Sequence, residues 1–245
     1  MTRTAPTSAN PPPLTRGHWR SLELLENTEA VLQTLGLYER LLGSPVYLRP
    51  TDKGLTVLSL DTAPLAMVGV GPSGGGCSLT TLPPSDDHVA AAVAGYHAKL
   101  ASMKRRSSEE RYVVSRIRAA LQGRLQLGDG LRFLHQEWRF TTKGKLDVLA
   151  IDEASGRLVV IEVKEAEGKA LDGATLEQAL AYVNLLTASW PEYVAYFRRL
   201  ATALGHIYDP SVPVPALSDD TPPRCEVWWP GGHRRVPHDG CAAAS

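Results

Sequence analysis

The stretch that most constrains the fold of this chain runs from residue 143 to residue 164. Two apolar runs rich in β-branched residues flank a short polar segment, which is the pattern of a β-hairpin. Three charged residues, Asp147, Glu162 and Lys164, lie within runs that otherwise suit burial. Because a buried charge is costly unless it is paired or bound to a metal, we expect these three charges to be compensated.

The expected register of the hairpin brings the three charges together. A turn centred between Ala154 and Ser155 places Asp147 opposite Glu162, and directly opposed residues have Cβ atoms about 4.5–5.5 Å apart. Two like charges there are unfavourable unless one is protonated or a cation lies between them. Strand alternation places Lys164 on the face of Glu162, so one face presents two carboxylates and one ammonium.

Carboxylates arranged in this way suit a divalent metal ion. Mg²⁺ typically takes one or two protein carboxylates and keeps several waters, and Mn²⁺ is the other candidate. Such an ion activates water and neutralises charge on a phosphate in the transition state. Lys164 is placed to orient that water or to stabilise developing negative charge. The hairpin therefore predicts a metal-dependent hydrolytic site.

The order of motifs along the chain supports this interpretation. A helix with an acid precedes a strand with Asp, a turn, a strand that ends in Glu-x-Lys, and a helix with Gln-x-x-x-Tyr. The residues concerned are Glu110 (or Glu109), Asp147, Glu162, Val163, Lys164, Gln178 and Tyr182. Over roughly residues 107–229 this order resembles the PD-(D/E)XK nuclease superfamily, with its RecB-like branch as the nearest match. Lys145, two residues before the aspartate, stands where that branch often has arginine.

The resemblance implies a role for each matching residue. Asp147 and Glu162 would hold the metal with help from the Val163 carbonyl. Lys164 would act on the attacking water. The motif helix would carry Gln178 and Tyr182 on one face beside the site, where they would steady the substrate.

The acid of the first helix has two interpretations. Glu110 matches the catalytic acid of the family. It also has capping-box spacing from Ser107, which would use its carboxylate to satisfy the helix N-terminus. Glu109 is the alternative acid.

Two alternatives to the nuclease interpretation remain open. Asp147, Glu162 and Lys164 could form a paired patch on the wet face of a surface hairpin. The fold could also be kept without the activity, which would leave a catalytically inactive module that binds nucleic acid or a partner protein.

Composition sets limits on partners and compartment. The 26 basic and 26 acidic residues give no net charge, so any basic surface for nucleic acid must be local. Cys77, Cys225 and Cys241 lack the spacing of a disulfide framework, zinc site or iron–sulfur cluster. No secretory signal or apolar run of membrane-spanning length is present, so we expect a cytoplasmic protein without a membrane partner.

The expected fold class is α/β, or α+β overall, with a restriction-endonuclease-like core. Its central mixed sheet would be flanked by helices and preceded by a small α+β module. The expected segments are a disordered tail (1–16), that module, of unknown role (17–103), the nuclease-like domain (104–230) and a flexible tail (231–245). Within the module we expect two short helices, broken near Asn27 and Gly36, and four short strands between residues 46 and 82.

These features together predict a metal-dependent nuclease that hydrolyses phosphodiester bonds of DNA in repair, recombination or defence. Mg²⁺ or Mn²⁺ would be its cofactor. A homodimer, or a protein partner bound through residues 17–103, stays open.

Overall fold

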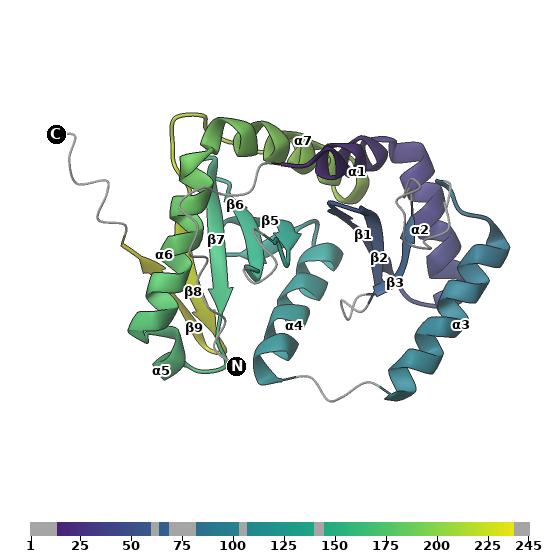
Figure 1. Cartoon of the computed structure of the whole chain (residues 1–245), viewed down its shortest axis with the longest axis horizontal. Coiled ribbons are helices and arrows are strands. Elements are labelled where there is room, and N and C mark those ends of the chain that lie inside the picture. Colours follow the sequence, from purple (N-terminus) through teal and green to yellow (C-terminus); the bar gives the residue numbers. More distant parts are fainter. Residues whose placement is uncertain (1–13, 60–63, 69–81, 103–106, 140–144, 238–245) are drawn as a thin grey trace. The chain divides into compact units, whose positions relative to one another are not determined.

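The computed structural model describes residues 14–59, 64–68, 82–102, 107–139 and 145–237 (Figure 1). The chain divides into two compact units. One, here called the motif unit, contains Ser107–Arg198 and the chain from Val214 onward. The other, the N-terminal unit, contains Leu14–Arg106 and also Arg199–Pro213. The sequence did not indicate that this later segment belongs with the N-terminal residues.

The N-terminal unit combines helices with a small antiparallel sheet of order β1-β2-β3. Its elements are α1 (Arg16–Glu26), α2 (Thr28–Leu42), β1 (Val46–Thr51), β2 (Gly54–Ser59), β3 (Pro64–Val68) and α3 (Asp86–Ser102). Helix α1 contacts β1 and β2, while α3 contacts α2 and β3. The fourth expected strand, at residues 78–82, falls almost wholly outside the described residues.

The helix boundaries of this unit partly confirm the sequence expectations. Asn27 ends α1, and its side chain caps α2 by accepting a hydrogen bond from the Ala30 N–H. The expected break near Gly36 is wrong, because α2 continues through it and ends only at Gly43 in the left-handed conformation. Helix α1 already begins at Arg16, inside the expected tail, while residues 1–13 lie outside the described residues.

The motif unit is built on a six-stranded mixed sheet of order β4-β5-β6-β7-β8-β9. Its elements are α4 (Ser108–Gln122), β4 (Gln126–Gly128), β5 (Leu131–Gln136), β6 (Val148–Asp152), β7 (Arg157–Val163), α5 (Glu167–Ala170), α6 (Gly173–Ala188), β8 (Arg224–Trp229) and β9 (Gly232–Val236). Helix α7 (Trp190–Tyr208) belongs to this unit up to Arg198 and to the N-terminal unit from Arg199 onward. Strands β7 and β8 are parallel and the other neighbours are antiparallel. Helix α6 runs alongside β7 and β8 (Figure 1). The expected fold class is confirmed.

Two expectations for the motif unit are wrong. The first part of the tail expected at residues 231–245 instead forms β9, an edge strand whose His233, Arg234 and Arg235 gave no apolar signal, while residues 238–245 lie outside the described residues. Charged residues are common on edge strands because they discourage pairing with other chains. The loop expected at residues 165–175 contains the short helix α5 and the start of α6.

The β6–β7 hairpin has the predicted register. Val148 pairs with Ile161, and Asp152 with Arg157, around a turn of residues 153–156. Gly156 adopts a φ of 65°, and a Cβ there would lie 2.3 Å from the Ala216 carbonyl oxygen. The turn therefore requires glycine for both its conformation and its close contact.

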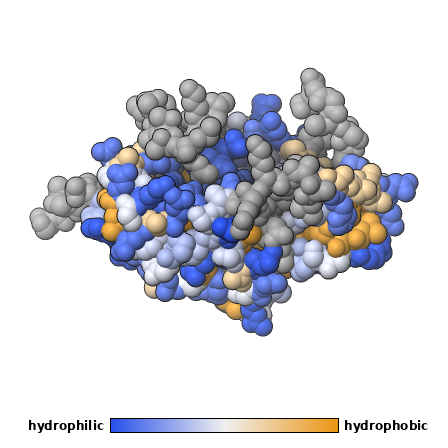
Figure 2. Space-filling view, turned by 90° about the horizontal axis from the view of Figure 1, so that it is seen from below, coloured by the Kyte–Doolittle hydropathy of each residue, from blue (hydrophilic) through white to orange (hydrophobic). Residues whose placement is uncertain are grey.

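Large apolar side chains are exposed only at scattered positions of the described chain, namely Leu32, Leu41 and Val212. Hydrophilic residues cover most of the face drawn in Figure 2. Among the described helices, none has both the length and the apolar character needed to cross a bilayer.

A buried ion-pair network links β6 to β8. Arg224 donates to Asp152 Oδ2 at 3.1 Å and also pairs with Glu226 on its own strand. Burial would raise the pKa of Asp152, but hydrogen bonds from Arg224, Ser155 and Ala154 outweigh it and lower that pKa below its ordinary value of 3.8.

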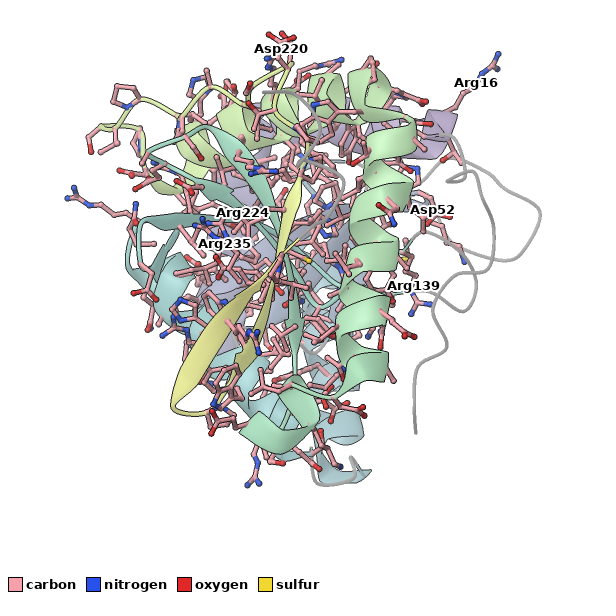
Figure 3. All side chains as sticks on the ribbon, turned by 90° about the vertical axis from the view of Figure 1, so that its left-hand side faces the viewer. Arg16, Asp52, Arg139, Asp220, Arg224 and Arg235 are labelled. Carbon is pink, nitrogen blue, oxygen red and sulfur yellow. The ribbon has the colours of Figure 1, made fainter. Side chains whose placement is uncertain are left out.

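We predict that Asp152→Asn lowers the free energy of unfolding at pH 7 by about 1–3 kcal/mol, because the buried Arg224 loses a charged acceptor. Since the folded-state pKa is depressed, this stabilisation is present above pH 3.8 and is lost as pH falls through the folded-state pKa. The stabilities of wild type and variant, measured by urea titration, should therefore converge as pH falls below the folded-state pKa of Asp152. Asp220→Asn, at an exposed position (Figure 3), is the control and should change stability little; a deficit independent of pH would contradict the prediction.

Candidate functional site

Glu162, at the end of β7, has no exposed surface. Its Oε1 accepts hydrogen bonds from Lys164 Nζ at 2.7 Å and from Gln178 Nε2 at 3.1 Å. The Lys164 side chain is 15% exposed, so its ammonium joins a buried carboxylate to the surface. The charge that burial makes costly is thus compensated by an ion pair and an amide.

Asp147 lies immediately before β6 and is 5% exposed. Its Oδ2 accepts a 2.9 Å hydrogen bond from the N–H of Val163, between Glu162 and Lys164. The backbone N–H of Lys164 in turn donates to the Trp228 carbonyl on β8. The structure therefore brings the three sequence-predicted charges to one end of β7, and the burial of the two carboxylates argues against a wet surface patch.

Helix α6 supplies two further predicted residues, Gln178 and Tyr182, which are 5% and 0% exposed. Besides its bond to Glu162, Gln178 Nε2 donates to Tyr182 Oη at 3.3 Å. Tyr182 Oη then donates to the Lys145 carbonyl oxygen at 3.1 Å. These bonds run from the Glu162 carboxylate to the segment that carries Asp147. Both side chains hold the site together, and their expected contact with substrate stays a prediction.

The hydrogen bonds at the N-terminus of α4 test the capping-box interpretation of Glu110. The Glu110 N–H donates to Ser107 Oγ, and the Ser107 N–H donates to Glu110 Oε2, both at 3.1 Å. The capping box is therefore confirmed. Glu110 is exposed and engaged at its own helix end.

Glu109 is differently placed on the same helix end. Ser108 Oγ donates to Glu165 Oε2 at 3.4 Å, which brings the start of α4 to the residues that directly follow Lys164. The pKa of Lys169 is raised mainly by its hydrogen bond and ion pair with Glu165, and the charge of Glu109 adds to this. Glu109 therefore lies near the segment that leaves β7.

Sequence reasoning missed one acidic residue beside the site, Glu137. Its backbone N–H donates to the Asp147 carbonyl at 2.9 Å, and its side chain forms an ion pair with Lys145. Glu137 has a φ of 55°, in the left-handed region that non-glycine residues rarely adopt. The only signal in the sequence was a charge at the end of an apolar strand.

The donor set fits a metal of the Mg²⁺ type. Within the described chain no group of three or more His, Cys, Asp or Glu residues is placed to hold a metal ion. Mg²⁺ is commonly held by one or two carboxylates together with waters. Asp147 and Glu162 supply carboxylate oxygens, the ligand type that Mg²⁺ prefers.

The described cysteine gives no sign of reactive chemistry. Cys225 lies buried in β8, and burial raises the pKa of its thiol to about 11. The expectations for Cys77 and Cys241 concern positions outside the described residues.

Comparison with curated proteins finds similarity over part of this chain. A UPF0102 protein of Mycobacterium avium (strain 104) is 40% identical over 72 residues, which are 29% of this chain and 47% of that protein. The chain thus spans about half the length of the relative that it matches. No family model matches the chain. No solved structure matches it either.

We predict that Tyr182→Phe lowers the free energy of unfolding by about 0.5–1.5 kcal/mol, because the partly buried hydrogen bond to the Lys145 carbonyl is lost. Urea unfolding measures the change. Tyr38→Phe is the matched control, since the buried Tyr38 hydroxyl has no hydrogen-bond partner in the described structure, and it should be neutral or stabilising. Equal losses in both variants would show that the Tyr182 bond contributes nothing specific.

Proposed function

We propose that this protein is a metal-dependent nuclease that hydrolyses phosphodiester bonds of DNA. The observation that carries the proposal is the convergence of buried Asp147, buried Glu162 and partly exposed Lys164 at one end of β7. Buried ion pairs are often no more stabilising than well-packed apolar residues. Burial of two carboxylates and an ammonium therefore adds little stability, so a catalytic role explains these residues better than a stabilising one.

The carboxylates of Asp147 and Glu162, with the Val163 carbonyl, would hold Mg²⁺ or Mn²⁺. When bound, the ion supplies Lewis acidity that lowers the pKa of a water and offsets charge on the phosphate. Lys164 would donate a hydrogen bond to the attacking water or to a phosphate oxygen, since its ammonium is anchored to Glu162 yet reaches the surface. Gln178 keeps Glu162 oriented.

The acid contributed by α4 would be Glu109. The carboxylate of Glu110 is engaged in the capping box, whereas Glu109 lies near Lys169 in the segment that follows Lys164. In this arrangement Glu109 would orient a water at the edge of the site, and Glu110 would keep the first turn of α4 in place.

DNA is the proposed substrate because phosphodiester hydrolysis is the chemistry that the motif resemblance implies. The balanced overall charge means that DNA affinity depends on local cations. Lys145, Lys164 and Lys169 lie around the end of β7, and each is paired with a glutamate. A role in repair, recombination or defence, and a dimer or partner bound through the N-terminal unit, remain predictions.

The direct test incubates the purified protein with single-stranded, double-stranded and branched DNA, with RNA in parallel, and with Mg²⁺ or Mn²⁺. Asp147→Asn and Lys164→Ala should each reduce cleavage by about 10²–10⁴-fold, since each removes a group that acts on the reacting atoms. Circular dichroism checks that both variants fold, and Asp220→Asn should cleave like wild type. Cleavage that survives both substitutions would overturn the site assignment. Salt-sensitive DNA binding without cutting would favour the inactive binding module.

Metal binding has a readout that is independent of cleavage. Mn²⁺ should raise the melting temperature of the wild type, because a ligand that binds only the folded state stabilises it by mass action. Glu162→Gln should abolish this shift, since the substitution keeps the shape of the side chain but removes one anionic ligand. Differential scanning fluorimetry across a Mn²⁺ titration measures both, with Asp220→Asn as control. An undiminished shift in Glu162→Gln would place the metal elsewhere.

A further inference from the structure

An ion pair at the flank of the site has no role in the chemistry proposed so far. Lys145 Nζ contacts Glu137 Oε1, and their side chains are 22% and 39% exposed. The pair joins the end of the β5 segment to the segment that leads into β6. Unlike the Glu162–Lys164 pair, both of its members are open to solvent.

Lys145 is held at a defined place relative to Asp147. Its carbonyl accepts the hydrogen bond from Tyr182, and the following Leu146 N–H donates to the Trp138 carbonyl at 3.0 Å. Lys145 is thus held by backbone contacts two residues before Asp147, and its partner Glu137 donates its backbone N–H to the Asp147 carbonyl. Both members of the ion pair are therefore fixed next to the segment that carries Asp147.

The backbone of Glu137 has a conformation that glutamate rarely adopts. Its φ of 55° favours glycine or asparagine over a residue with a longer side chain. Strained backbone of this kind is concentrated at functional sites, where the surrounding structure imposes it. Here the backbone is held by the bond from the Glu137 N–H to the Asp147 carbonyl, and the side chain that it presents covers the Lys145 ammonium.

We propose that Lys145 binds a phosphate oxygen of DNA beside the scissile bond. In the free protein the Glu137 carboxylate pairs with the Lys145 ammonium, and the phosphate displaces that carboxylate when DNA binds. The inference rests on the proposed function and adds to it a residue that contacts substrate and a device that limits binding. Partly exposed ion pairs contribute little net free energy, so a phosphate can take the place of Glu137. The released carboxylate then becomes hydrated at the surface. DNA seated in the site thereby gains a cation that is largely neutralised in the free protein.

Equilibrium DNA binding tests this inference without cleavage. The probe is fluorescein-labelled double-stranded DNA, read by anisotropy over a salt titration with Ca²⁺ in place of Mg²⁺. Glu137→Gln should bind about two- to fivefold more tightly than wild type, which is the usual contribution of a partly exposed ion pair. Lys145→Gln should bind more weakly and reduce the slope of log K against log salt by about 0.9, the value for one lost phosphate contact.

The double variant gives the decisive comparison. If Glu137 acts through Lys145, then Glu137→Gln has no effect on affinity once Lys145 is glutamine. Glu137→Gly should tighten binding like Glu137→Gln and melt no lower than wild type, because glycine suits the left-handed backbone. Glu26→Gln is the matched control, since it breaks the Glu26–Arg199 pair of the N-terminal unit and should leave affinity unchanged.

Each contrary result has a defined meaning. Equal tightening by Glu137→Gln with and without Lys145 would show general repulsion of DNA and overturn the inference. An unchanged salt slope in Lys145→Gln would show that Lys145 meets no phosphate. If wild type binds and cuts DNA while these variants behave like it, only this inference fails. If wild type binds no DNA, the proposed function fails with it.

Discussion

The burial of one carboxylate organises the motif unit. Glu162 has no exposed surface, so its charge requires partners that the surrounding chain must deliver. Lys164 comes from the same strand, two residues on, and Gln178 comes from α6. The position of α6 on the sheet and the exit of the chain from β7 are therefore both tied to a single oxygen, Glu162 Oε1.

The same interaction extends to the second carboxylate. Gln178 bonds to Tyr182, and Tyr182 bonds to the backbone just before Asp147, whose own carboxylate is held by the Val163 N–H. Three separate segments are thus connected through buried or partly buried hydrogen bonds, which fix the two carboxylates more firmly than a loop would. The lysines around them are paired with glutamates, so under the proposed function a phosphate would have to replace a glutamate at each lysine that it contacts.

Local chemistry explains which expectations held. The β6–β7 register followed from strand alternation and from a turn that needs glycine at position 156. Expectations failed where local signals were ambiguous. Gly36 was expected to break a helix. Helix α2 continues through it, because buried residues of the helix lie both before and after this glycine. Strand β9 is highly charged and pairs only because β8 offers it an edge. The spacing of Glu110 from Ser107 fits two roles equally, and only the contacts show the capping box.

The sequence by itself determined the mixed α/β class, the hairpin and its register, and the identity of the three charges at its end. These depend on periodicity and turn chemistry, which act between residues close in the chain. Only the tertiary structure decided that Glu162 is fully buried, that Gln178 and Tyr182 bond to each other and to the Asp147 segment, and that Glu137 covers Lys145. Those contacts join separate elements of the fold, and hydrogen bonds of a few ångströms between them depend on packing that no local pattern encodes.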